Sequence, residues 1–336
     1  MENRYMSDYH IGIIDIGTVS TRLFIAKEVD GRIHTILRQS EITDLGQGRS
    51  VSSYLISEAI HRTLSQVKEY VEILKEYHLD SVVCTLTSAA RDADNIDELL
   101  NPLLELNLQP EVITGDVEAR LSFLGVSSDF PDERILVLDI GGGSTEVSIG
   151  KFSTEDELEP YDLEYVRSFD VGCKRVTELF FKNDPPTEEE LDAARAWAHD
   201  EFGTSLEDLD RVNRLVAVGG SATSLVSVLK KLEPYDAKEV HLAHMQGGQV
   251  SDLLEELSSL PLHERERLQG LQAKRAPVIV GGALILELFM GMGGFSELVV
   301  SESDMLMGIA KYETLKLEGK ELPFNWEVRS SSAFNV

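Results

Sequence analysis

Two stretches of the chain end an apolar run with an aspartate and continue with glycines and hydroxyl side chains. Residues 11–26 read IGIIDIGTVSTRLFIA, and residues 135–150 read ILVLDIGGGSTEVSIG. Glycine lets backbone N–H groups approach a phosphate closely, and serine and threonine add hydroxyl donors. An aspartate beside a phosphate needs a divalent cation that screens the two negative charges from each other. The pattern therefore predicts a phosphate-binding turn with a metal ion, used twice.

The second stretch repeats the first position by position. The matched pairs are Asp15 with Asp139, Gly17 with Gly141, Ser20 with Ser144, Thr21 with Thr145, and Arg22 with Glu146. A separation of about 120 residues is too long for a solenoid repeat and suits a duplicated domain. Two such turns from related halves are expected to face each other across a cleft and hold one chain of phosphates.

A third glycine turn, in AVGGSATSL, follows another apolar run and opens a helix, whose N-terminus attracts anions. Together the three turns supply most of the candidate phosphate-binding residues: Gly17, Thr18, Ser20, Gly141, Gly142, Gly143, Ser144, Thr145, Gly219, Gly220 and Ser221. Asp15 and Asp139 are the candidate metal ligands at the strand ends.

Strand-like and helical patterns alternate along both halves of the chain. Residues 53–78 carry apolar side chains at helical spacing, 81–88 are rich in β-branched residues, and 115–126 begin as helices do. In the second half, the strand at 214–220 leads into a helix, and another helix is expected at 276–292. This alternation predicts an α/β fold with crossover helices.

Composition limits the classes of function. The chain has 336 residues and a formal net charge of -28, which argues against a nucleic-acid-binding face. A polyanionic substrate must then be held by a local cluster of donors. The apolar stretch 277–294 is interrupted by Glu287 and small residues, so we expect a buried helix and no membrane contact. The charged start MENRYMSDYH and the two cysteines favour a cytoplasmic protein without disulfides.

The three turns are also those of the actin, Hsp70 and sugar-kinase superfamily. Within it, the chain most closely resembles the exopolyphosphatase and guanosine pentaphosphate phosphohydrolase (Ppx/GppA) family, over residues 10–317. Four further stretches carry this resemblance: TSAARDADN, ITGDVEARLSFLGV, DVGCKRVTE and KRAPVIVGGALIL. The resemblance implies two related ribonuclease-H-like (actin-like) domains. We expect residues 1–127 with 304–320 in the first, 128–303 in the second, and 321–336 as a flexible tail.

The resemblance also implies roles for individual residues. The glutamate that activates water falls on Glu118, the second functional acid on Glu146, and the metal-linked aspartate on Asp139. Glu146 is therefore both a catalytic candidate and a metal candidate. Four basic family positions, expected to bind phosphate, fall on Arg22, Arg91, Arg175 and Arg275. From the residues alone, a glutamate just inside a helix that starts at a glycine turn can face a cleft, or simply complement the helix N-terminus.

The chain departs from the family pattern at three places. Val19 replaces an asparagine in the first turn, Val117 replaces the acid beside Glu118, and Leu306–Met307 replace an arginine–glutamate pair. The resemblance implies an exopolyphosphatase that uses Mg²⁺ (or Mn²⁺), releases orthophosphate from linear polyphosphate, extends to guanosine pentaphosphate, and forms a homodimer. Two alternatives stay open: a phosphotransferase of the same superfamily, and a protein that binds polyphosphate or guanosine alarmones with little turnover.

Overall fold

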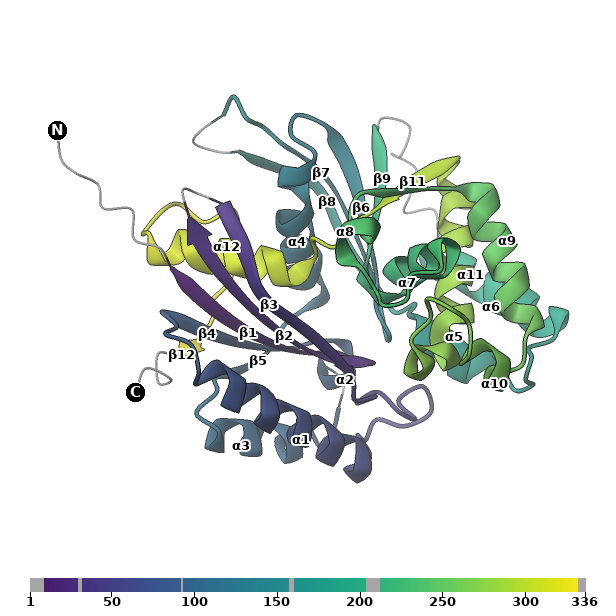
Figure 1. Ribbon diagram of the computed structural model, residues 1–336, viewed down its shortest axis with the longest axis horizontal. Helices are drawn as coiled ribbons and strands as arrows, with labels where there is room; N and C mark the ends of the chain where they lie inside the picture. Colours follow the sequence, from purple (N-terminus) through teal and green to yellow (C-terminus); the bar gives the residue numbers. More distant parts are fainter. Residues whose placement is uncertain (1–8, 30–31, 92, 157–159, 204–211, 332–336) are drawn as a thin grey trace.

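Two sheets of six strands each organise the protein in the computed structural model, which describes residues 9–29, 32–91, 93–156, 160–203 and 212–331 (Figure 1). The first sheet has the order β12-β4-β1-β2-β3, with β5 paired to β4, and the second has the order β10-β11-β9-β6-β7-β8. Each sheet begins with an antiparallel hairpin that contains one of the repeated turns, β1–β2 and β6–β7. The predicted α/β class is confirmed.

The first sheet is covered on both faces. Its strands are β1 (His10–Ile16), β2 (Ser20–Val29), β3 (Arg32–Ile42), β4 (Ser81–Leu86), β5 (Pro110–Val112) and β12 (Ser330–Ser331). Because side chains alternate along a strand, Ile14 and Ile16 face helices α1 (Ser57–Leu74) and α3 (Asp97–Glu105), whereas Ile11 and Ile13 face α12 (Met305–Leu317). The short helix α2 (Ser88–Arg91) follows β4.

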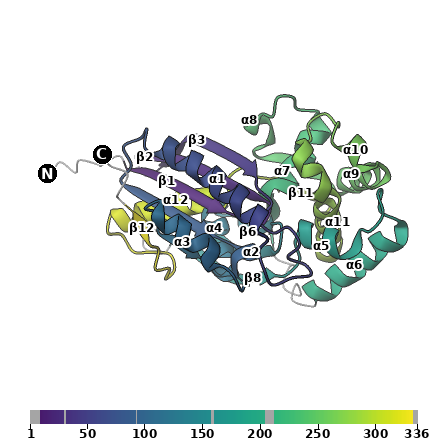
Figure 2. The ribbon, with the colours of Figure 1, turned by 90° about the horizontal axis from the view of Figure 1, so that it is seen from below.

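The second sheet supports most of the remaining helices (Figure 2). Its strands are β6 (Arg134–Ile140), β7 (Thr145–Phe152), β8 (Tyr161–Phe169), β9 (Arg214–Val218), β10 (Ala243–Gln246) and β11 (Glu297–Val300). The helices of this half are α5 (Cys173–Phe180), α6 (Glu188–Phe202), α7 (Gly219–Lys230), α8 (Ala237–Val240), α9 (Gly247–Ser259), α10 (Leu262–Arg265) and α11 (Ala276–Gly293). Helix α11 has the length and composition of a membrane span, but 67% of that apolar window is buried inside the protein. The expected buried helix is confirmed.

Helix α4 (Gly115–Val126) packs between the two sheets and crosses α12. Its Leu121 and Leu124 join the core beneath the first sheet, and its Phe123 and Val126 join the core beneath the second. A Cβ on Gly125 would lie 2.0 Å from the carbonyl oxygen of Asp304, so the two helix backbones are in direct contact. Although α4 falls within the predicted first domain, it buries side chains against both sheets.

The flexible tail expected from residue 321 onward requires correction. Trp326 and Val328 are buried in the core under the first sheet, and Ser330 and Ser331 pair antiparallel with β4. The Trp326 indole donates a hydrogen bond to Glu111 at 2.7 Å. Aromatic burial therefore fixes residues 321–331 against the first sheet, while 332–336 lie outside the described residues.

Candidate phosphohydrolase site

The two repeated turns have the same backbone geometry. The Gly17 N–H donates to the Ser20 carbonyl at 2.9 Å, and the Gly141 N–H donates to the Ser144 carbonyl at 3.0 Å. Each turn is therefore closed by its own glycine, which leaves neither of these two N–H groups for a phosphate. The expectation that Gly17 and Gly141 bind phosphate through their own N–H groups is corrected; both residues instead shape the cavity wall.

The carbonyl groups within the turns are held by the chain that follows each hairpin. The Thr18 carbonyl accepts from Gly46 at 2.8 Å, and the Gly142 carbonyl accepts from Lys174 at 2.9 Å. In a trans peptide the N–H points opposite to the C=O, so the N–H groups of Val19 and Gly143 point away from these anchors. The turns also touch each other: a Cβ on Gly142 would lie 2.6 Å from Val19.

A cavity of about 980 Å³ opens beside the facing turns. It collects residues that lie far apart in the sequence, among them most of the candidates named above: Asp15, Gly17, Thr18, Ser20, Arg22, Glu118, Asp139, Gly141, Gly142, Ser144, Gly219, Gly220, Ser221 and Arg275. Arg91 and Glu146 stand behind this wall and contact its residues. Thus the three turns and the start of α4 do share one site.

Glu118 is held in the site by Arg91, at the C-terminal end of α2. One Arg91 amine donates to Glu118 Oε2 at 2.7 Å, and the other donates to Ser144 Oγ at 3.1 Å. That second amine also lies 3.8 Å from Glu146 Oε1, which accepts a hydrogen bond from Ser168 at 2.7 Å. One arginine therefore links two acids and the second phosphate turn.

The acids of this site resist ionisation. Burial raises the pKa of Glu118 to about 7, although Arg91 opposes the shift. Burial, and then the negative charge of Glu118, hold the pKa of Glu146 well above its ordinary value. Burial likewise raises the pKa of Asp139 to about 6, against the hydrogen bond that Ser122 donates at 2.7 Å. Arg91 and Arg22 only partly offset the three buried carboxyl groups, which leaves room for additional positive charge.

The predicted metal ligands are not gathered into one cluster. Within the described residues no group of three His, Cys, Asp or Glu side chains is placed to hold an ion. The Asp15 carboxylate is already bound by Arg22 and by the Thr85 hydroxyl. Asp139 and Glu146 remain suitable, and Glu146 Oε2 is buried without a hydrogen-bond partner in the described part of the chain. Asp15 is therefore removed from the predicted metal ligands, and the assignment of Asp139 and Glu146 stays a prediction.

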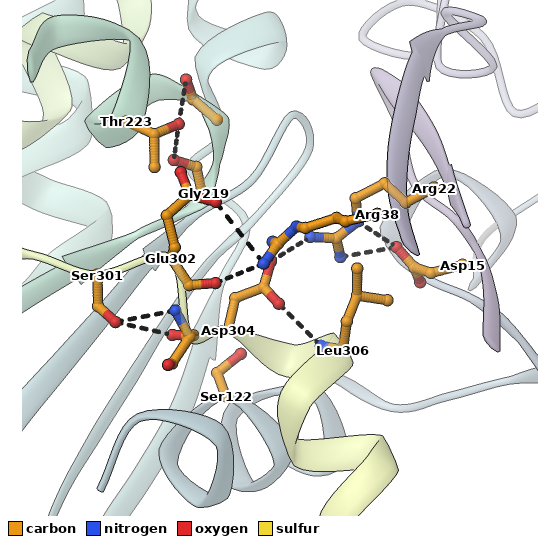
Figure 3. A network of polar contacts seen from close by, with 12 residues as sticks. Asp15, Arg22, Arg38, Ser122, Gly219, Thr223, Ser301, Glu302, Asp304 and Leu306 are labelled. Atoms are coloured by element: carbon orange, nitrogen blue, oxygen red, sulfur yellow. Dashed lines mark hydrogen bonds and ion pairs between the residues drawn. The ribbon is translucent and has the colours of Figure 1, made fainter. Parts of the chain in front are cut away.

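An arginine network closes the side of the cavity next to the first sheet (Figure 3). Arg22 reaches Asp15 and Asp304, each at 2.7 Å, and Arg38 reaches Asp304 at 2.6 Å. Burial lowers the pKa of Arg22, but the carboxylates of Asp15 and Asp304 outweigh burial and raise it above its ordinary value. Asp304 also accepts from the Leu306 N–H and so caps α12. The network joins β1, β2 and β3 to the last helix.

The third turn is shaped around Arg275. Gly219 has a φ of +88°, which favours glycine, and a Cβ on Gly220 would lie 1.7 Å from the Arg275 guanidinium. The guanidinium therefore rests on the backbone at the start of α7. Burial lowers the pKa of Arg275, and no carboxylate of the described chain lies within ion-pair distance. Arg275 is the cation of this cavity best placed to meet an anionic ligand.

Three predicted phosphate-binding residues lie elsewhere. Thr145 is fully buried and donates its hydroxyl to the Val171 carbonyl, because its side chain points into the core of the second sheet; its assignment is wrong. Gly143 and Arg175 line a smaller, neighbouring cavity. Arg175 donates to the Gly143 carbonyl at 2.9 Å and lies 3.2 Å from Asp170.

Sequence reasoning missed Arg38, Ser122 and Asp304. Asp304 precedes an apolar helical segment, as N-cap residues do, and that signal was available. The ion pairs of Asp304 could not be predicted from the sequence, because they join strands β2 and β3 to a helix more than 250 positions later. Ser122 lies in the middle of α4, where no sequence pattern marks a partner for Asp139.

Comparison with known proteins agrees with this geometry. The Ppx/GppA phosphatase family model matches residues 24–304. The chain is 35% identical to the bifunctional 3-dehydroquinate synthase/phosphatase of Fusobacterium nucleatum, over 91% of this chain and 47% of that protein, so it spans about half of that relative. It is 33% identical to Exopolyphosphatase 2 of Mycobacterium tuberculosis, over 89% of this chain and 97% of the relative.

A solved structure gives the same result. The crystal structure of the Aquifex aeolicus Ppx/GppA family member superimposes with a TM-score of 0.77 at 32% identity, covering 93% of this chain and 99% of the other. The resemblance drawn from the sequence is thereby confirmed. The chain belongs to the Ppx/GppA phosphatase family.

Proposed function

We propose that this protein hydrolyses the terminal phosphoanhydride bond of linear polyphosphate and releases orthophosphate. The observation that carries this proposal is the Glu118 carboxyl group, buried beside two facing phosphate turns and held there by Arg91. A pKa raised by burial to about 7 suits a general base near neutral pH. The mycobacterial relative, which the chain covers almost completely, is named an exopolyphosphatase.

The chain's own residues account for positioning and proton transfer. The Val19 N–H group, Ser144 and Arg275 hold the terminal phosphates, while Arg91 keeps Glu118 next to Ser144. Ionised Glu118 takes a proton from a water molecule as that water attacks the terminal phosphorus. The bond to the bridging oxygen breaks, and the shortened chain leaves with the bonding electron pair.

A divalent cation, Mg²⁺ (or Mn²⁺), fits the acids of the site. Asp139 and Glu146 would hold it, because both have a raised pKa and Glu146 has a buried oxygen without a partner in the described chain. Mg²⁺ is commonly held by one or two carboxylates together with substrate phosphates, and it neutralises charge on them. We expect excess chelator to abolish phosphate release and added Mg²⁺ to restore it. Full activity in excess chelator would contradict a metal-dependent reaction.

Phosphate release from long-chain polyphosphate, measured beside ATP and guanosine pentaphosphate, separates the candidate functions. Release from polyphosphate supports the proposal. Transfer from ATP to an acceptor without hydrolysis would identify a phosphotransferase. Tight binding of polyphosphate or alarmone with no measurable turnover would identify a binding protein.

Conversion of guanosine pentaphosphate to the tetraphosphate is a second candidate. Beyond the turns, the large cavity continues along an apolar wall that includes Leu232, Tyr235, Leu268 and Leu271. Such a wall suits a purine base better than it suits further phosphates. Turnover of guanosine pentaphosphate, weakened by Tyr235→Ala while that of tripolyphosphate is kept, would support this activity.

Assembly and cellular location belong to the same proposal. We expect a homodimer in the cytoplasm that binds neither nucleic acid nor membranes, in keeping with a net charge of -28. Light scattering coupled to gel filtration measures the mass, and a 37.3 kDa species at working concentration would contradict the dimer.

A further inference from the structure

A second cavity, of about 260 Å³, lies on the other side of the facing turns. It shares Thr18 and Gly142 with the large cavity, so only the contact between the two turns separates them. The first turn of α5 and the loop that follows β3 complete its wall.

Its lining differs from that of the large cavity in charge. Arg49, Lys174 and Arg175 line it, and none of the described residues in its wall is an acid. The large cavity, by contrast, is lined by seven acidic residues: Asp15, Glu118, Asp139, Glu233, Glu266, Glu302 and Asp304. In a chain of net charge -28 an acid-free cavity with three cations is a local exception. It is therefore suited to an anion.

The carboxylates near this cavity hold its cations in place. Asp44 and Glu178 bind the Lys174 amine at 2.8 and 2.9 Å, and Asp170 binds Arg175 at 3.2 Å. They offset part of the positive charge, so binding also needs neutral donors. The hydroxyls of Ser52 and Ser88 supply these, whereas those of Ser50 and Ser53, also in the wall, already donate to Glu178 and Asp94.

A buried hydroxyl lies where the two turns separate the cavities. Thr18 is 6% exposed, and its Oγ1 has no hydrogen-bond partner within the described residues. A Cβ on Gly143 would lie 2.4 Å from Ser88 Oγ and 3.1 Å from Thr18 Oγ1. Both hydroxyls thus lie directly beside the Gly143 backbone, which leaves no room for a side chain at that position. A phosphate oxygen in the cavity, within hydrogen-bond reach of the buried Thr18 hydroxyl, would give it a partner.

We propose that this cavity is a second phosphate subsite, separate from the one where the terminal bond is cleaved. Its ligand is a phosphate group held by Arg49, Lys174, Arg175 and the hydroxyls beside Gly143. The group comes from one of two sources: orthophosphate released beyond the turns, or an inner phosphate of a long chain. The choice between sources rests on the proposed hydrolysis, whereas the existence of the subsite does not.

Binding of inorganic phosphate to the chelator-treated protein tests the subsite without turnover. Arg49 is the residue to change, because its guanidinium donates to the Ser52 carbonyl at 2.7 Å and it has no part in the cleavage site. We expect titration calorimetry to show two phosphate sites in wild type and, in Arg49→Gln, one of them weakened at least tenfold. Arg195→Gln, which removes a partly exposed arginine beside Glu287, is the matched control. Identical isotherms for Arg49→Gln, Ser88→Ala and wild type would overturn the proposal.

Steady-state kinetics then identify the source. If the subsite takes product, Arg49→Gln raises the inhibition constant of orthophosphate at least fivefold and leaves the KM for tripolyphosphate unchanged. If it takes an inner phosphate, Arg49→Gln raises the KM for long polyphosphate but not for tripolyphosphate. A wild-type protein that binds phosphate at two sites but hydrolyses none of these substrates would refute the proposed function and leave the subsite standing.

Discussion

The two hairpins share a backbone and differ in charge. In the first, Asp15 and Arg22 are cross-strand partners, and they form an ion pair at 2.7 Å. In the second, Asp139 and Glu146 occupy the equivalent positions, and both have a raised pKa. Cross-strand partners lie on the same face of a sheet. A single difference, arginine against glutamate, therefore gives one neutralised hairpin and one hairpin with two neighbouring acids.

This difference assigns separate tasks to the two halves. The first hairpin satisfies its own aspartate and joins it to Asp304 at the start of the last helix. The acids of the second hairpin lack nearby positive charge. Such acids are suited to binding a cation and to accepting a proton from water. Glu118 belongs with the second group, since it shares Arg91 with Glu146. Four experiments test this division, from the largest expected effect to the smallest.

Glu118→Gln removes the proposed base from the acidic half. Turnover should fall about 10²- to 10⁴-fold, the usual scale for loss of a positioned acid–base group. The measurement is phosphate release at saturating polyphosphate, with circular dichroism to show that the fold is kept. A rate within threefold of wild type would exclude Glu118 as the base and make Glu146 the candidate.

Arg22→Gln removes the ion pair that neutralises Asp15 in the first hairpin. Asp15 is 1% exposed, so its carboxylate would lose its buried partner, and Asp304 would lose one of two. Removal of one member of a buried pair costs about 3 kcal/mol or more of unfolding free energy. Urea unfolding at neutral pH measures the loss, with Arg195→Gln as the surface control. An equal midpoint for both variants would show that the pair does not stabilise the fold.

Asp139→Asn should change the unfolding free energy in the opposite direction, by stabilising the fold. Because the folded pKa of Asp139 is raised to about 6, its ionisation removes stability as the pH rises from the unfolded pKa to about 6. Above pH 6, without metal, the amide should therefore increase the unfolding free energy by about 3 kcal/mol. The gain should vanish below pH 4, and Mg²⁺ should stabilise wild type but not the variant. A destabilised variant at pH 8 would contradict this account of the acidic half.

The pH dependence of kcat/KM sharpens the comparison further. Glu118 must be ionised to accept a proton, so with its pKa at about 7 the rate should fall about tenfold per unit below that pH. Since Arg91 lowers the pKa of Glu118, Arg91→Gln should move the acidic side of the pH–rate profile to higher pH. A flat profile between pH 5 and 8 would show that no group of this kind acts as the base.

The sequence predicts the parts that repeat. Two copies of one phrase were enough to place both hairpins, and Glu118, assigned from the family resemblance, lines the large cavity. It also predicts the long buried helix α11, whose apolar length exceeds that of the other segments. Periodicity and turn chemistry are local properties, and local properties can be read from neighbouring residues.

Contacts between distant segments could not be read in this way. Alignment with a phosphate turn suggested Thr145 as a ligand, but the pleat of β7 directs its hydroxyl to Val171. Likewise, Val19 packs on Cys173 and Val278, and Leu306 is fully buried under the first sheet. These two departures from the family pattern fill apolar contacts between segments that the sequence holds far apart.

The contact between α4 and α12 at Gly125 has a mechanical consequence. Glu118 lies two turns before Gly125 on α4, a distance of about 10 Å at the α-helical rise. If α4 rotated by about 10° about its contact with α12 at Gly125, the Glu118 backbone would move by about 2 Å. A hydrogen bond to a water molecule does not tolerate such a displacement. We expect Gly125→Ala, which forces the helices apart, to lower turnover more than it lowers phosphate binding. The helix crossing at Gly125 thus sets the position of the proposed base, although the two lie about 10 Å apart along α4.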